Sequence, residues 1–104
     1  MIKILKECQR EIEEFPEVVR EELADAIVRL EEGVSLSFPL SRPMSIIGKG
    51  VHEIRLGDKT GIYRIIYAFV YSDGVWLLHA FKKTTNATPT QAINLSKKRL
   101  KKVP

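Results

Sequence analysis

The chain has 104 residues, with 17 Lys and Arg against 13 Asp and Glu, which gives a formal net charge of +4. This length fits a single domain spanning residues 1–104, and a hydrophobic share of 44% excludes a chain that is disordered throughout. The charge alone is weak support for nucleic-acid binding. Its distribution says more, because acidic residues concentrate before residue 33 while residues 97–102 are strongly basic.

Cys8 is the only cysteine, so the sequence predicts no internal disulfide. Its spacing with Leu5, Ile12 and Phe15 places it on an apolar helix stripe, which favours a buried thiol over a nucleophile. We find no metal-ligand spacing, no glycine-rich phosphate loop, no secretory signal and no membrane span. The expectation is therefore a cytoplasmic protein with no metal, no other cofactor and no membrane partner.

The first third of the chain carries two helical patterns separated by Pro16. Each pattern repeats at steps of three and four, on Leu5, Cys8, Ile12 and Phe15 and then on Val19, Leu23, Ala26, Ile27 and Leu30. Pro16 suits the first position of the second helix, and Gly33 suits its C-terminal stop. The two segments predict an amphipathic helical hairpin that packs on a sheet. The alternation of Ile2 and Ile4 leaves a short strand before residue 6 open.

The rest of the chain predicts a loop, a sheet and a closing helix. Prolines and glycines punctuate residues 34–50, where an extended piece at 44–47 is an open alternative. Period-two patterns predict strands at 51–56, 62–71 and 75–82, with turns at 57–61 and 72–74. Thr88-Pro89-Thr90-Gln91 reads as a capping box with Thr88 as N-cap of a basic terminal helix. The predicted class is α+β: a helical hairpin on a small antiparallel sheet of three to four strands, followed by a C-terminal helix.

Basic residues on the predicted strands are the candidates for chemistry. Arg64 lies inside an apolar strand, where it is either a fork that grips a phosphate or the partner of Glu53 or Asp73 in an ion pair. Arg55 is nearer a strand end, where it either binds an anion or is simply exposed. Cations that converge on neighbouring strands favour an anion-binding surface that handles phosphate.

The third strand adds two lysines and a histidine. Lys82 and Lys83 are either solvated strand-end residues or, beside other cations, lysines of lowered pKa that move protons near neutral pH. His79 is a weaker candidate, because a histidine between Leu78 and Ala80 is more typical of a core position. The sequence does not fix the strand registers, so it leaves open which of these side chains share a face.

Four segments in this order resemble the phage-derived HigB-like toxins of the RelE/ParE superfamily. They are GVHEIR at 50–55, YRIIY at 63–67, LLHAFKK at 77–83, and Thr88-Pro89 followed by a lysine-rich helix. The resemblance covers nearly the whole chain and implies a RelE/ParE-like fold. It also implies the toxin of a type II toxin–antitoxin system, which acts as a metal-independent endoribonuclease on mRNA at the ribosome. The implied partners are a helix-turn-helix antitoxin, the ribosome and mRNA.

Under this resemblance each basic residue receives a role. Arg64 would stabilise the transition state, Lys82 or Lys83 would support it or act as base or acid, and His79 would be a further candidate. RNA contacts would come from Arg55, Lys97, Lys98 and Arg99. Two alternatives remain open: a ParE-like inhibitor of DNA gyrase, and a non-catalytic module that binds a partner such as an antitoxin helix.

Overall fold

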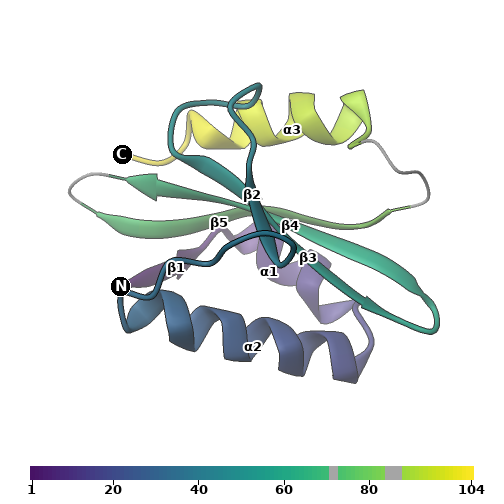
Figure 1. Ribbon diagram of the computed structural model, residues 1–104. Helices are drawn as coiled ribbons and strands as arrows, with labels where there is room; N and C mark the ends of the chain where they lie inside the picture. The colour runs from purple at the N-terminus through teal and green to yellow at the C-terminus, as the bar shows by residue number, and fades with distance from the viewer. Residues whose placement is uncertain (71–72, 84–87) are drawn as a thin grey trace.

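The computed structural model describes residues 1–70, 73–83 and 88–104 (Figure 1). In chain order the elements are β1 (Ile2–Ile4), α1 (Lys6–Glu13), α2 (Glu17–Glu31), β2 (Ser41–Pro43), β3 (Val51–Asp58), β4 (Gly61–Val70), β5 (Gly74–Lys83) and α3 (Thr90–Leu100). The predicted α+β class is confirmed. The predicted turn at 72–74 begins outside the described residues. The predicted second strand, 62–71, also ends outside them.

The sheet has five strands in the order β1-β5-β4-β3-β2, which corrects the expectation of three to four. β1 runs parallel to β5, and the other neighbouring pairs are antiparallel. The two additional strands, β1 and β2, lie at the edges and have three residues each. β1 is the short strand before residue 6 that the alternation of Ile2 and Ile4 left open, whereas β2 lies in the segment that the sequence predicts as a loop. The extended piece that the sequence left open at 44–47 is not a strand, because residues 45–47, shortly after β2, form a turn.

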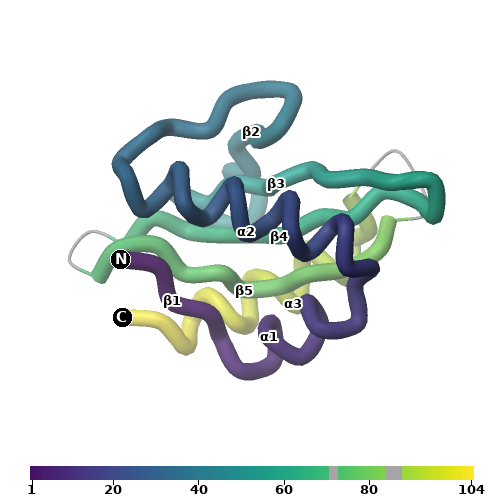
Figure 2. Tube along the Cα trace, turned by 90° about the horizontal axis from the view of Figure 1, so that it is seen from below, coloured from purple at the N-terminus to yellow at the C-terminus, as the bar shows by residue number. Residues whose placement is uncertain are grey.

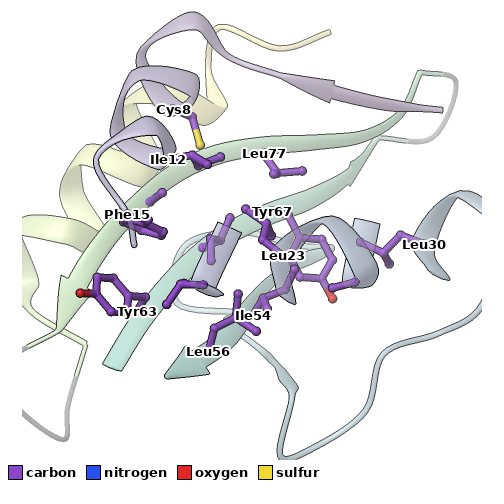
Figure 3. Packing of buried hydrophobic residues seen from close by; sticks show 14 of the residues in the cluster. Cys8, Ile12, Phe15, Leu23, Leu30, Ile54, Leu56, Tyr63, Tyr67 and Leu77 are labelled. Atoms are coloured by element: carbon purple, nitrogen blue, oxygen red, sulfur yellow. The ribbon is translucent and has the colours of Figure 1, made fainter. Parts of the chain in front are cut away.

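The sheet lies between two helical layers. Helices α1 and α2 contact β5 and β3 on one face, while α3 lies on the opposite face against β5 (Figures 1 and 2). The larger core forms under α1 and α2 and includes Cys8, Ile12, Leu23, Ile54 and Ile65 (Figure 3). A second core under α3 contains Met44, Ile47, Val51, Ile66, Ala68 and Leu78.

Two helix starts differ slightly from the expected positions. Pro16 and Pro89 occupy the N-cap positions of α2 and α3, one residue before each helix begins. Thr88 therefore does not cap α3, and its hydroxyl instead donates to Glu53 at 2.9 Å. Gly33 does follow α2 as predicted, with a φ of 81° that favours glycine, and its N–H donates to the carbonyl of Leu30.

A register shift between β4 and β5 decides which β5 residues face α3. Ile66 lies opposite His79, but Tyr67 lies opposite Leu77, so Leu78 is the extra residue of a β-bulge. Leu78 consequently packs in the core under α3, while Leu77 packs in the core under α1 and α2. No helix among the described residues combines the length and the apolar character needed to cross a membrane.

Candidate active site

The strand registers bring four cations onto the sheet face that α3 partly covers. Arg55 on β3 lies directly opposite Arg64 on β4, and Arg64 lies opposite Phe81 on β5. Side chains alternate along a strand, so Lys83, two residues beyond Phe81, is on the same face as Arg64. Arg42 of β2 joins them at the sheet edge. We call Arg42, Arg55, Arg64 and Lys83 the basic cluster.

Glu53 lies within the basic cluster and is completely buried. Its carboxylate accepts hydrogen bonds from Arg64 Nη1, from Arg42 Nε at 3.2 Å and from the Thr88 hydroxyl at 2.9 Å. Arg42 Nη2 also reaches the Thr88 oxygen, at 3.4 Å. The ion pair with Glu53 that the sequence left open for Arg64 is therefore present, and the same carboxylate also binds Arg42.

The cluster nevertheless keeps an excess of positive charge. Within the described residues, Glu53 is shared by Arg42 and Arg64, so one carboxylate faces two guanidinium groups, and Arg55 has no ion pair there. Arg64 as a whole is 1% exposed. Its Nε atom has no hydrogen-bond partner in the described part of the chain. A buried N–H without a hydrogen-bond partner is costly. Glu53 therefore satisfies only part of the Arg64 guanidinium, and the Nε–H of the same side chain is left without an acceptor among the described residues.

The pKa of Lys83 is lowered by this environment. Burial of the ammonium lowers it first, and the Arg64 guanidinium lowers it further, while Glu53 acts in the opposite direction. Burial also lowers the pKa of Arg64, against the raising effect of Glu53. A buried lysine beside arginines gives up its proton more readily than a solvated one, which suits proton transfer.

Lys82 and Lys83 lie on opposite faces of the sheet. Lys82 is exposed and its Nζ lies 5.9 Å from the ring centroid of Tyr63, on the face covered by α1 and α2. The register therefore places Lys83 on the same face of the sheet as Arg64. Lys82 lies at the same end of β5 but on the opposite face of the sheet.

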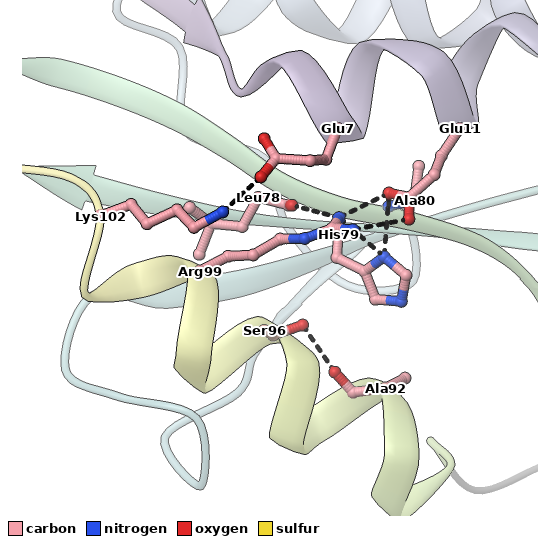
Figure 4. Close-up of polar contacts among 9 residues, drawn as sticks. All are labelled: Glu7, Glu11, Leu78, His79, Ala80, Ala92, Ser96, Arg99 and Lys102. Carbon is pink, nitrogen blue, oxygen red and sulfur yellow. Dashed lines mark hydrogen bonds and ion pairs between the residues drawn. The ribbon is translucent and has the colours of Figure 1, made fainter.

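His79 belongs to a separate polar network that joins α1, β5 and α3 (Figure 4). Its Nδ1 lies 3.0 Å from Oε1 of Glu11, and Arg99 binds both oxygens of the same carboxylate at 2.7 and 3.0 Å. The backbone N–H of Ala80 also donates a hydrogen bond to Glu11, at 3.1 Å. This N–H is available because β1 pairs only with residues 75–77 of β5. Burial would raise the pKa of Glu11, but hydrogen bonds from His79, Arg99 and Ala80 outweigh it and lower the pKa to about 2.

This network changes the interpretation of Arg99. We expected Arg99 to contact RNA, but its guanidinium is buried, bound to Glu11 and to the carbonyl of Leu78 at 3.0 Å. Its position on α3 turns it toward the sheet, whereas the neighbouring Lys97 and Lys98 are exposed. Of the three RNA contacts predicted on α3, only Lys97 and Lys98 therefore lie on its solvent-exposed surface, where they remain candidates.

Sequence reasoning missed Arg42, Thr88 and Glu11 as members of these networks. Arg42 lies in a segment that reads as a loop, and Thr88 reads as a helix cap. Glu11 lies on the polar side of α1, where nothing in the helical pattern distinguishes it from the other acidic residues. Within the described residues, no group of three or more His, Cys, Asp or Glu side chains is placed to hold a metal ion.

Comparisons with known proteins agree with this architecture. No curated protein matches the chain in sequence. The structure is similar to the isolated RelE toxin of E. coli, with a TM-score of 0.63 and 18% sequence identity over 90% of this chain and 95% of that one. The model of a family described as phage-derived Gp49-like proteins matches residues 10–101. The predicted resemblance to phage-derived members of the RelE/ParE superfamily is thereby confirmed, and the chain belongs to the family of phage-derived Gp49-like proteins.

Proposed function

We propose that the chain is the toxin of a type II toxin–antitoxin system and acts as a ribosome-dependent endoribonuclease on mRNA. The observation that carries this proposal is the basic cluster, four cations around one buried carboxylate on a RelE-like fold. Such a surface favours a group with more than one negative charge. A phosphodiester that becomes a phosphorane during RNA cleavage is a group of this kind.

The proposed reaction requires a proton acceptor, a proton donor and cations. The 2′-hydroxyl oxygen attacks the adjacent phosphorus and loses its proton to a base. The bond from phosphorus to the 5′ oxygen then breaks, and an acid gives a proton to that leaving oxygen. The products are a 2′,3′-cyclic phosphate and a 5′-hydroxyl, and the chemistry consumes no cofactor.

Arg64 and Arg55 are assigned to the phosphorane oxygens, because they face each other at the centre of the cluster. Lys83 is assigned to proton transfer or to charge stabilisation, since it shares their face and its pKa is lowered. Lys82 reaches the same end of the sheet from the other face and is the weaker candidate. His79, whose Nδ1 is bound to Glu11, lies further along β5.

The charge distribution supports one orientation on a polyanion. Exposed lysines lie on α3, whereas the exposed side of α2 carries the acidic residues Glu17, Glu21, Glu22 and Asp25. An electric field of this polarity turns the α3 side toward RNA and the α2 side away from it. We expect the exposed residues Lys97 and Lys98 to contact ribosomal RNA or mRNA, and a helix-turn-helix antitoxin to be the protein partner.

A second candidate is a toxin without catalysis, such as a ParE-like inhibitor of DNA gyrase. The ion pair between Arg64 and Glu53 favours it, because a guanidinium held by a buried carboxylate is less available to a substrate. In that case the basic cluster would serve binding or folding.

Purified protein in a translating extract separates the two candidates. We expect the wild-type protein to produce mRNA breaks that primer extension maps to defined codon positions, and Arg64→Ala and Lys83→Ala to lose them. Lys59→Ala is the matched control, because Lys59 is exposed in the turn between β3 and β4. Intact mRNA together with blocked DNA supercoiling by gyrase would overturn the nuclease in favour of the gyrase inhibitor.

A further inference from the structure

A pocket of about 300 Å³ lies between the second half of β5 and the first turns of α3. Its lining includes His79, Phe81, Lys82, Gln91 and Leu95. The pocket adjoins the basic cluster, because Phe81 lies directly opposite Arg64 on the neighbouring strand and two residues before Lys83. It therefore lies within one nucleotide's reach of the proposed phosphate position.

The contacts of Arg99 are the basis for assigning which nitrogen of His79 carries the proton in the neutral ring. Arg99 Nη1 has two hydrogens, which point to Oε1 of Glu11 at 2.7 Å and to the carbonyl of Leu78 at 3.0 Å. Arg99 Nη1 also lies 3.3 Å from His79 Nδ1, but this is the longest of its three contacts. We therefore assign its two hydrogens to the oxygen acceptors, and the Nδ1–H of the neutral ring donates to Glu11 across 3.0 Å. Nε2 is then a hydrogen-bond acceptor, and Figure 4 shows it pointing away from Glu11.

The pocket also has a flat aromatic wall. The rings of His79 and Phe81 stack with their centroids 4.8 Å apart and their planes at 27°. Gln91 on α3 adds an amide that both donates and accepts hydrogen bonds. An aromatic wall and an oriented acceptor, beside the cations of the basic cluster, form the set of groups that binds a nucleobase with its phosphate.

We propose that this pocket binds one nucleobase of the RNA, next to the phosphate held by the basic cluster. His79 Nε2 accepts a hydrogen bond from an N–H group of the base, and Glu11 positions the imidazole for that contact. The identity of the ligand as RNA rests on the proposed function, but the pocket and its donor and acceptor pattern do not.

Nuclear magnetic resonance tests the pocket without any cleavage. The chain has two histidines, and His52 stacks on Tyr67 on the other face, so its ring signal is an internal control. We expect adenosine 5′-monophosphate to shift the ring signals of His79 and Phe81 saturably and to leave His52 unchanged. Ribose 5-phosphate, which lacks the base, should leave all three signals in place. An equal shift with ribose 5-phosphate, or no shift with the nucleotide, would overturn the proposal.

Variants sharpen the test. Phe81→Leu should weaken nucleotide binding at least about fivefold, the lower end of what one base–aromatic stack contributes, with the fold checked by its amide spectrum. Phe38→Leu is the matched control, because Phe38 is 70% exposed and does not line the pocket, and it should bind as the wild type does. Equal weakening in both variants would overturn the assignment of the pocket.

The result is separable from the nuclease proposal. Nucleotide-dependent shifts at His79 in a protein that cuts no mRNA would support the pocket and overturn the nuclease. Cleavage of mRNA by a protein whose His79 and Phe81 signals do not respond to the nucleotide would overturn the pocket and leave the nuclease in place.

Discussion

Arg55 and Arg64 stand directly opposite each other on the antiparallel strands β3 and β4. Like charges at opposed positions destabilise a sheet. Glu53 pairs with Arg64, whereas Arg55 has no ion pair within the described residues. The fold thus retains a repulsion that an apolar or neutral pair would avoid, which is the pattern of a site that gives up stability for binding.

Replacement of Arg55 by glutamine tests whether the repulsion between the two arginines lowers the stability of the fold. We expect Arg55→Gln to raise the free energy of unfolding by about 0.5 kcal/mol, because it removes one member of a like-charged cross-strand pair, and to slow mRNA cleavage. Urea unfolding at low salt measures the first effect. Lys59→Gln, in the exposed turn that joins the same strands, should change neither quantity. A loss of stability in Arg55→Gln would contradict the interpretation.

Glu53→Gln should destabilise the protein by about 3–5 kcal/mol, since it leaves the buried Arg64 and its neighbour Arg42 without their shared counter-charge. Added phosphate should restore part of this loss by binding between the two guanidinium groups, and should stabilise the wild type less. Chemical denaturation with and without phosphate measures both effects. Glu31→Gln on the exposed side of α2 is the control, and an equal response to phosphate in the two variants would count against an anion site at Glu53.

The stability of the protein should fall in acid because of Glu11. Its pKa is about 2 in the folded protein against an ordinary value of 4.5, so the unfolded chain binds more protons between these values. The contribution of Glu11 is therefore complete above about pH 4.5 and is lost as the pH falls toward 2. Thermal unfolding from pH 6 to pH 2 should show a smaller decline in Glu11→Gln than in the wild type. Parallel declines would show that Glu11 is not held by His79 and Arg99.

Cys8 should be unreactive in the folded protein. Burial raises the pKa of its thiol to about 12, so almost no thiolate is present at neutral pH, and the side chain is fully buried. We expect a disulfide reagent to modify Cys8 only at the rate at which the protein unfolds. Ser45→Cys provides an exposed thiol for comparison and should react at once. Fast modification of Cys8 under native conditions would contradict its place in the core.

The sequence predicts the elements with long patterns. Cys8 and Ile12 on α1, Phe15 just after it and the continuation of the stripe on α2 are buried as expected, and β3, β4 and β5 follow the predicted strands within a few residues. These elements are readable because each repeats its apolar spacing over two or more periods. β1 and β2 have three residues each and depend on partners far along the chain, so their own residues carry no comparable signal.

The arrangement of the candidate site was predictable in part. Arg64, Arg55 and Lys83 stand out as cations in apolar strands, and the register places all three on one face. Sequence could not decide between Lys82 and Lys83, because a shift of one residue exchanges the faces and the bulge at Leu78 changes the register within β5. Nor could it assign Arg99 to Glu11, a contact that needs α1 and α3 to meet around the edge of β5.

The most direct test of the central proposal is the single-turnover rate at which the protein cuts an mRNA bound to purified ribosomes. We expect Arg64→Ala to lower this rate by about 100-fold or more, the usual effect of removing one donor that stabilises transition-state charge, while Lys59→Ala matches the wild type. Circular dichroism verifies that Arg64→Ala is folded. A folded Arg64→Ala protein that cuts at the wild-type rate would contradict the assignment of phosphate chemistry to the basic cluster.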